Sequence, residues 1–526
     1  MVATVVCVTA GLAIVVGLIV GMKVHPVLAL VAATVAVLAL TPAANRREAR
    51  RDVWVSSQLR SVPMTRRTPA VIDALRRKAA ESDASDPDAA TIGRELSTAL
   101  AATAGKLALP IVFASVIGAC LLHCGAAAVV ADRLVSAAGP RRVPPAMSAT
   151  SFFLSIPIYF DSVFYLLLPL ARAASERSGP DAGDEAGRRP PPGGYLLMVL
   201  SVVVGGTMAH SLVPPTPGPL MVAEQLSVPV GKMILGGSML GVCTASVGLA
   251  YAFWISRRMR IEPPSVDDVS SFDDDSSVEG SPAERPGGTS HAGPPLIVAC
   301  LPILLPLALL STHGVWTQID PSVADAGWVA ATGDYTLVLG LAAATSIAVH
   351  RRYRGGNRST ADVVSAAVAD AGVIVLLTAA GGAFGASLRD AGVGLLLGDV
   401  VAGSASTGSV TTTGPVTTTV LPLAFGVTVF MRAAQGSATV AMLTAAAIVA
   451  PLVQRGLTFD PIYLALAIGC GSKPLAWMND SGFWLVGRLS GMTVGETLRT
   501  FSAVLTLMGL AGFAIVWTLA SVLPGV

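Results

Sequence analysis

Apolar runs of about 20 residues recur along almost the whole chain, and they restrict its possible folds more than any other feature. Only 13% of the 526 residues are charged, whereas soluble domains carry about 25%. So few charges cannot cover a water-exposed surface, and a backbone inside lipid has to satisfy its own hydrogen bonds. The sequence therefore predicts an all-α polytopic membrane protein with about 12 transmembrane segments.

Polar stretches divide the apolar runs into five regions. Arg clusters mark the first polar stretch, and acidic and Ser-rich sequence marks the second. Because Lys and Arg concentrate in cytoplasmic loops, both are expected inside the cell. The regions are two N-terminal transmembrane helices (1–42), an amphipathic or aqueous insert (43–105), a first membrane half (106–256), a disordered loop (257–294) and a second membrane half (295–526).

A short pattern occurs once in each membrane half. Residues 118–125 and 385–392 both read G-A-x-L-x-x-x-G, and each lies in a glycine-interrupted apolar segment. Interrupted segments at corresponding positions of two halves indicate a site at the interface between repeats. The pattern predicts a two-fold internal repeat with broken helices or re-entrant hairpins.

The first segment with unusual chemistry is 155–162, where Asp161 lies among aromatic and aliphatic residues. A carboxylate at membrane depth costs a few kcal/mol. Protonation, a partner cation or a water-filled cavity would each remove that cost. Asp161 is thus a candidate proton or cation site, with an interfacial Asp at a helix end as the alternative.

The second segment is 208–219, which holds four prolines within six residues. Each proline removes a backbone donor and clashes one turn back, so the helix has to break there. Broken backbone within a bilayer is tolerated only around a cavity or inside protein. His210 precedes the break; it is either a titrating or donating group or a satisfied polar residue.

Two polar breaks follow in the C-terminal half, at 432–439 and 479–482. The first leads into a helix expected to begin near Ser437, and helix N-termini bind anions through free N–H groups. Arg432 adds a positive charge beside it. The second break has three adjacent polar residues, with an ordinary aqueous turn as the alternative.

Five blocks of the sequence resemble one known family. They are SIPIYFDSVFYLLLPLA (155–171), HSLVPPTPGP (210–219), GGAFGASLRDAGVG (381–394), RAAQGSATVAMLTAAA (432–447) and NDSGFWLVGRLSGMTVGETLRT (479–500). The resemblance runs in order from about residue 107 to 520 and includes the polar residues. The blocks are similar to the gluconate permease family of bacterial gluconate–proton symporters.

The resemblance implies a secondary active transporter that imports gluconate or a related sugar acid by proton symport. It implies a multi-pass protein of the bacterial inner membrane, related to ion transporters built from inverted repeats with hairpins. The implied partners are a sugar-acid anion, protons and the lipid bilayer. This chain departs from the family pattern in its inserts at 43–105 and 262–294 and at Lys473, where a small or apolar residue is expected.

A sugar acid requires a cation for its carboxylate and hydrogen-bonding groups for its hydroxyls. Arg432 and helix N-termini are candidates for the first role, with Lys473 as a further one. A low dielectric favours the neutral form of a carboxyl group, which suits a proton carrier. The candidate substrate-binding residues are Arg432, Gln435, Gly436, Ser437, Thr439, Asn479, Ser481, His210 and Thr216. The candidate ion-coupling residues are Asp161 and Asp480.

Other functions are less consistent with the sequence. The chain lacks H-E-x-x-H, a G-x-S-x-G elbow and a P-loop, so we expect no enzyme activity and no ATP site. A net charge of +2 predicts no nucleic-acid partner, and we expect no cofactor and no metal. A transporter of di- or tricarboxylates coupled to Na⁺ remains an alternative, since unwound carbonyls near Gly436 and Gly471 suit Na⁺. The oligomeric state, a homo-oligomer included, is left open.

Overall fold

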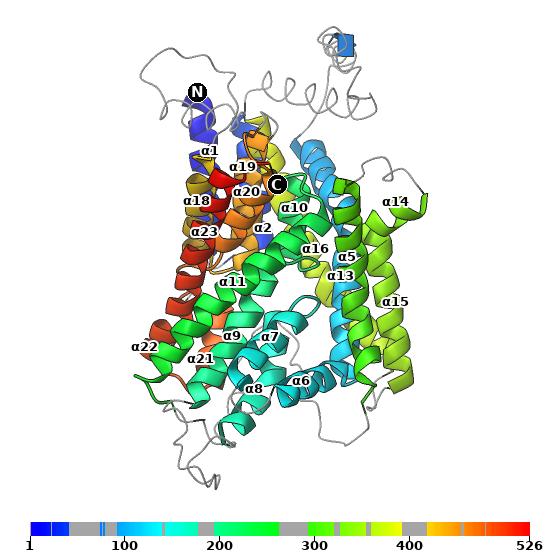
Figure 1. Cartoon of the computed structure of the whole chain (residues 1–526). Helices are drawn as coiled ribbons and strands as arrows, with labels where there is room; N and C mark the ends of the chain where they lie inside the picture. Colours follow the sequence, from blue (N-terminus) through cyan, green and yellow to red (C-terminus); the bar gives the residue numbers. More distant parts are fainter. Residues whose placement is uncertain are drawn as a thin grey trace, which may run out of the picture. The chain divides into compact units, whose positions relative to one another are not determined.

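The computed structural model confirms a helical membrane architecture (Figure 1). The residues that it describes are 2–22, 24–41, 74–75, 77–78, 92–138, 142–176, 194–261, 263, 293–319, 327–353, 359–391, 418–453, 457–478 and 480–525. Among them, six helices are long and apolar enough to cross a membrane. These are Ile92–His123, Gly194–Gln225, Val230–Ser256, Leu296–His313, Thr360–Asp390 and Val494–Val522. Most residues of the two expected inserts, 43–105 and 262–294, lie outside the described residues; the described ones are 74–75, 77–78, 92–105, 263 and 293–294.

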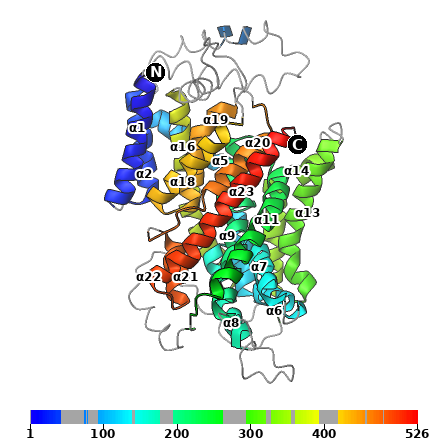
Figure 2. The same ribbon diagram turned by 60° about the vertical axis from the view of Figure 1, so that its left-hand side comes forward.

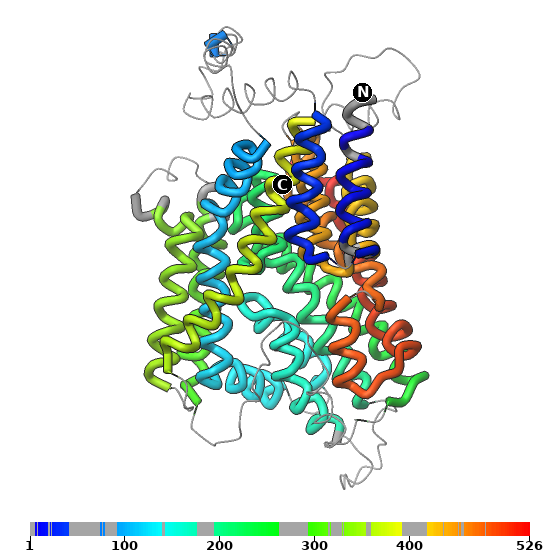
Figure 3. Tube along the Cα trace, turned by 180° about the vertical axis from the view of Figure 1, so that it is seen from behind, coloured from blue at the N-terminus to red at the C-terminus, as the bar shows by residue number. Residues whose placement is uncertain are grey.

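The contacts divide the chain into two compact units, of which the smaller comprises Met1–Gly105, Leu376–Val420 and Leu443–Thr458. Its N-terminal part is a hairpin of α1 (Val2–Val16), a π-helical turn η1 (Gly17–Gly21) and α2 (Pro26–Leu40). In Figure 3 the two helices lie side by side in dark blue. Pro26 occupies the first position of α2, and the His25 side chain accepts a hydrogen bond from the Val27 amide at 3.3 Å. Proline is favoured at this position because the first helical N–H has no partner within the helix.

The larger unit comprises Lys106–Val375, Leu421–Met442 and Phe459–Val526. In Figure 2, α23 runs along α11, which it contacts. The helices that lie wholly or partly in this unit are α5 (Ile92–His123), α6 (Ala126–Ala137), α7 (Val143–Leu154), α8 (Phe160–Glu176), α9 (Gly194–Leu212), α10 (Pro217–Gln225), α11 (Val230–Ser256), α13 (Leu296–Ile319), α14 (Gly327–Gly333), α15 (Tyr335–Tyr353), α16 (Thr360–Asp390), α18 (Val420–Gln435), α19 (Ala438–Val453), α20 (Pro461–Gly471), α21 (Ser481–Leu489), α22 (Val494–Thr497), η5 (Leu498–Ser502) and α23 (Ala503–Val522).

Helix α9 is buried on all sides and forms the axis of the larger unit. It packs against α7, α8 and α11. Glycines allow the closest approaches: a Cβ at Gly205 would collide with the Ser148 carbonyl of α7, and one at Gly237 of α11 would collide with the Leu212 carbonyl of α9. The small residues therefore set how closely the neighbouring helices approach α9.

Four interruptions separate consecutive helices of the larger unit, and their order repeats along the chain. We number them break 1 (155–159, between α7 and α8), break 2 (213–216, between α9 and α10), break 3 (436–437, between α18 and α19) and break 4 (472–480, between α20 and α21). A long helix precedes each pair of breaks, α5 with 32 residues before breaks 1 and 2 and α16 with 31 before breaks 3 and 4. The second break of each pair leads into a nine-residue helix, α10 or α21. The two-fold repeat expected from the sequence stays a prediction.

Candidate substrate and ion site

Breaks 1, 2 and 4 meet at the C-terminal end of α9. The Tyr159 ring of break 1 packs edge-on against the His210 ring, with centroids 5.9 Å apart. The Ser472 hydroxyl of break 4 lies 3.1 Å from the Ser211 hydroxyl. Because Pro214 and Pro215 end α9 immediately afterwards, the helix presents its last polar residues at the point where the other breaks arrive.

Breaks 3 and 4 are joined by a buried ion pair. Arg432 near the end of α18 pairs with Asp480, and their side chains are only 4% and 8% exposed. The other end of the guanidinium donates to the Gly436 carbonyl of break 3. Asp480 uses its second oxygen to accept the Gly482 amide at 2.8 Å, so it also caps α21. Both charges are therefore engaged within the protein.

The backbone of break 3 depends on glycine. Gly436 has φ = 76°, in the left-handed region where a Cβ is disfavoured. This conformation ends α18 and lets α19 begin at Ala438. The Trp477 indole of break 4 donates to the Ala433 carbonyl at 3.1 Å, which adds a second link between the two breaks.

Asp161 lies in the first turn of α8, next to break 1. Its side chain is exposed, unlike that of Asp480, which is close enough to interact with it electrostatically. The protonation of an exposed carboxyl group near a second carboxylate responds to the charge around it.

Several polar groups at these breaks have unused hydrogen-bonding capacity. His210 Nδ1 and Ser155 Oγ are buried and have no hydrogen-bond partner among the described residues. Lys473 of break 4 is 3% exposed and lies within electrostatic range of His210, Arg432 and Asp480. Donors and acceptors of this kind are suited to a ligand with hydroxyls and a carboxylate. Within the described residues, no group of three His, Cys, Asp or Glu side chains could hold a metal ion.

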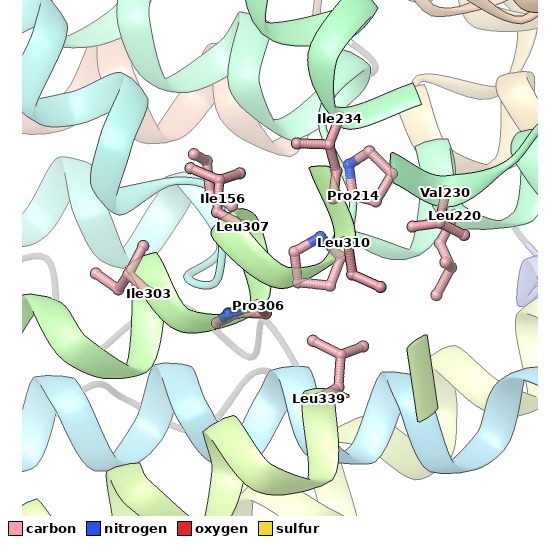
Figure 4. Close-up of a pocket in the computed structure, with 11 residues that line it drawn as sticks. Ile156, Pro214, Leu220, Val230, Ile234, Ile303, Pro306, Leu307, Leu310 and Leu339 are labelled. Carbon is pink, nitrogen blue, oxygen red and sulfur yellow. The ribbon is translucent and has the colours of Figure 1, made fainter. Parts of the chain in front are cut away.

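The hollows on either side of the breaks are apolar. Figure 4 shows one of about 10 Å³ between Ile156, Pro214 and the α13 residues Pro306 and Leu307. It has room for roughly one water and none for a sugar acid. A wide surface groove of about 900 Å³ is lined by Trp254 and other apolar side chains. Neither hollow suits a polyhydroxy acid, so the polar ends of the broken helices remain the best candidate site.

The family model of GntP family permeases matches residues 85–523 of this chain, which is most of its length. The chain belongs to the GntP permease family. The inner membrane permease YgbN of Escherichia coli K12 is 26% identical over 440 residues, covering 83% of this chain and 90% of its own. A gluconate permease of Pseudomonas aeruginosa is 28% identical over 421 residues, covering 80% and 85%.

The solved structures add a likeness in fold. The YdaH transporter of Alcanivorax borkumensis superposes with a TM-score of 0.51 at 14% sequence identity, covering 84% of this chain and 91% of its own. This GntP-family chain is therefore a permease and not an enzyme, and it is a multi-pass protein of the bacterial inner membrane.

The structure places the described candidate site residues of this GntP-family permease in the four breaks or in the helix turns next to them, in different environments. The Thr216 hydroxyl donates to the carbonyls of Val213 and His210, at 2.8 and 3.0 Å, and so ends α9. Ser437 Oγ accepts the Val440 amide at 3.3 Å, at the start of α19. Thr439 is half-buried in the first turn of α19, and Ser481 is exposed at the start of α21. Asn479 and the Gln435 side chain lie outside the described residues.

The residue list predicted from sequence left out three residues that the structure places at the breaks. Tyr159 and Ser155 both lie in the first block that resembles the family, where Asp161 was selected as the polar residue. Lys473 was named from the sequence as a further candidate for the substrate carboxylate and as a departure from the family pattern, but not in the residue list. A charge in an otherwise apolar run was the signal that pointed to it.

Proposed function

We propose that this permease imports gluconate or a related sugar acid together with a proton. The observation that carries the proposal is the position of Asp161: an accessible carboxyl group, at a helix break, within electrostatic range of the buried Asp480–Arg432 pair. A permease from Pseudomonas aeruginosa named for gluconate aligns over most of this chain and supports the substrate class.

Protonation of Asp161 supplies a simple coupling mechanism. Ionised Asp161 repels an approaching carboxylate, whereas the charge of Asp480 is already paired with Arg432. When Asp161 takes a proton, this repulsion disappears and an anion enters at lower cost. Proton and substrate then bind together, and alternating access carries both across the membrane.

Coupling to Na⁺ receives less support from the same residues. A Na⁺ site at break 3 would use the Gly436 carbonyl, which already accepts a hydrogen bond from Arg432. A guanidinium bound to that oxygen repels a second cation. The proposal therefore assigns coupling to a proton at Asp161.

The deciding experiment is uptake of labelled gluconate into proteoliposomes, with an imposed inward proton gradient and no Na⁺. We expect accumulation that an uncoupler abolishes. Uptake that requires Na⁺, or that favours a di- or tricarboxylate, would support the alternative symporter. Absence of uptake by folded protein under all these conditions would reject sugar-acid transport.

Substitution of Asp161 tests the coupling step. Asp161→Asn resembles the protonated carboxyl group but binds no proton, so accumulation should fall to the level of the uncoupled control. Exchange of labelled for unlabelled gluconate across the membrane should persist, since exchange needs no net proton movement. Asp132→Asn, an exposed carboxylate on α6, is the matched control and should accumulate normally. Full accumulation by Asp161→Asn would exclude the proposed role.

A further inference from the structure

Lys473 is a buried cation that the coupling mechanism does not use. Its side chain is 3% exposed, and it follows Ser472, whose hydroxyl bonds to Ser211 at the end of α9. This turn of break 4 therefore brings Lys473 to the end of α9, within electrostatic range of His210. Burying an ammonium group without an anion costs several kcal/mol, so its presence requires an explanation.

The charge of Lys473 lacks a free counter-charge within the structure. Asp480 is the carboxylate within electrostatic range among the described residues. One of its oxygens pairs with Arg432, and the other caps α21. No hydrogen bond to the Lys473 ammonium occurs within the described part of the chain. Arg432 and Asp480 compensate each other, so a protonated Lys473 has no carboxylate of its own among the described residues.

We propose that Lys473, rather than Arg432, binds the substrate carboxylate and selects acids that carry a single carboxylate. The proposal rests on the sugar-acid transport proposed above and identifies the residue that recognises the acid group. One ammonium balances one carboxylate, whereas a second carboxylate would be buried without a partner. His210 Nδ1 and Ser155 Oγ are buried at the same group of breaks and lack hydrogen-bond partners among the described residues, so they are candidates for binding hydroxyls of the ligand.

The test measures uptake kinetics of labelled gluconate for the wild-type protein, Lys473→Gln and Lys473→Arg in proteoliposomes. Lys473→Gln should raise KM about 10- to 100-fold, as expected for losing a hydrogen bond to a charged group, with a smaller change in Vmax. Lys473→Arg keeps the charge and should recover part of the affinity. The matched control, Lys106→Gln, removes an exposed lysine paired with Glu224 and should leave KM unchanged.

Competition by unlabelled compounds tests the selectivity. For the wild-type protein, gluconate should compete best, the dicarboxylate glucarate weakly and the uncharged polyol sorbitol not at all. Lys473→Gln should lose most of this discrimination between gluconate and sorbitol. A thermal unfolding midpoint close to that of the wild type would show that Lys473→Gln is folded. If Lys473→Gln is unstable, the competition assay compares the wild type with Lys473→Arg.

The outcomes separate the two proposals. Wild-type uptake with an unchanged KM in Lys473→Gln overturns the role of Lys473 and leaves sugar-acid transport intact. Glucarate competing as well as gluconate overturns the selectivity for a single carboxylate. Absence of wild-type gluconate uptake overturns the proposed function, and the role of Lys473 falls with it.

Discussion

At the scale of single residues, the Arg432–Asp480 pair has two tasks that are separable by substitution. It neutralises two buried charges, and through Asp480 it caps α21. Arg432→Met leaves the carboxylate buried and unpaired, and we expect it to lower the free energy of unfolding by about 3–5 kcal/mol. Asp480→Asn leaves Arg432 unpaired and should cost a similar amount, although asparagine retains the cap.

The double variant Arg432→Met/Asp480→Asn removes both charges while keeping the cap. It should therefore be more stable than either single variant, with a favourable coupling energy in a double-mutant cycle. Unfolding by denaturant in detergent micelles, followed by tryptophan fluorescence, provides the measurement. A double variant as unstable as the sum of the two singles would show that the charges do not compensate each other.

At the scale of elements, Asp460 both caps the start of α20 and connects α20 to a neighbouring helix. The Asp460 side chain accepts the Ile462 amide at 3.0 Å, at the N-terminus of α20. Its other oxygen lies 2.5 Å from the Lys232 ammonium on α11. Asp460→Ala should lower the free energy of unfolding by about 1 kcal/mol more than Asp460→Asn, because asparagine still caps the helix.

The loss in Asp460→Asn should itself be small, about 1 kcal/mol or less, because the pair is only partly buried and the ion pair alone is removed. The same denaturant titration measures both variants. Equal stabilities of the alanine and asparagine variants would show that the cap does not stabilise α20. Asp460 and its partner Lys232 both lie outside the four breaks, so neither variant should change the KM for substrate.

At the scale of the larger unit, the packing of α9 sets where the breaks lie. Gly237→Ala on α11 places a methyl group about 2.8 Å from the Leu212 carbonyl carbon, so α9 or α11 has to shift. Overpacking of this kind should cost about 1–3 kcal/mol in the free energy of unfolding. Since Leu212 lies two residues from His210, we also expect slower uptake at saturating substrate.

The matched control is Gly372→Ala on α16, where no neighbouring atom lies within 4 Å of the new methyl group. Its stability should be unchanged or slightly higher, because alanine favours helix over glycine. Thermal unfolding and initial uptake rates compare the two variants directly. Equal behaviour of both would show that the close approach of α11 to α9 does not position the site.

The sequence alone predicted the class of protein, the polar breaks and the family. These features depend on local signals: apolar length defines a membrane span, and closely spaced prolines such as Pro214 and Pro215 interrupt a helix, although single prolines such as Pro110 lie inside one. The polar residues in the broken segments were recognisable for the same reason, because polar groups in apolar runs are costly. Local signals do not specify which of these groups contact one another.

Only the tertiary structure decided which residues pair. Asp480 meets Arg432 across 48 positions, and Ser472 meets Ser211 across 261. The first contact occupies the arginine that the sequence suggested for the substrate, and the second brings Lys473 within electrostatic range of His210. Such pairings depend on how helices that are distant in the sequence pack around α9. Because the groups are buried, losing a partner costs several kcal/mol. The sequence by itself determined where the helices break, and packing determined which of their polar groups pair.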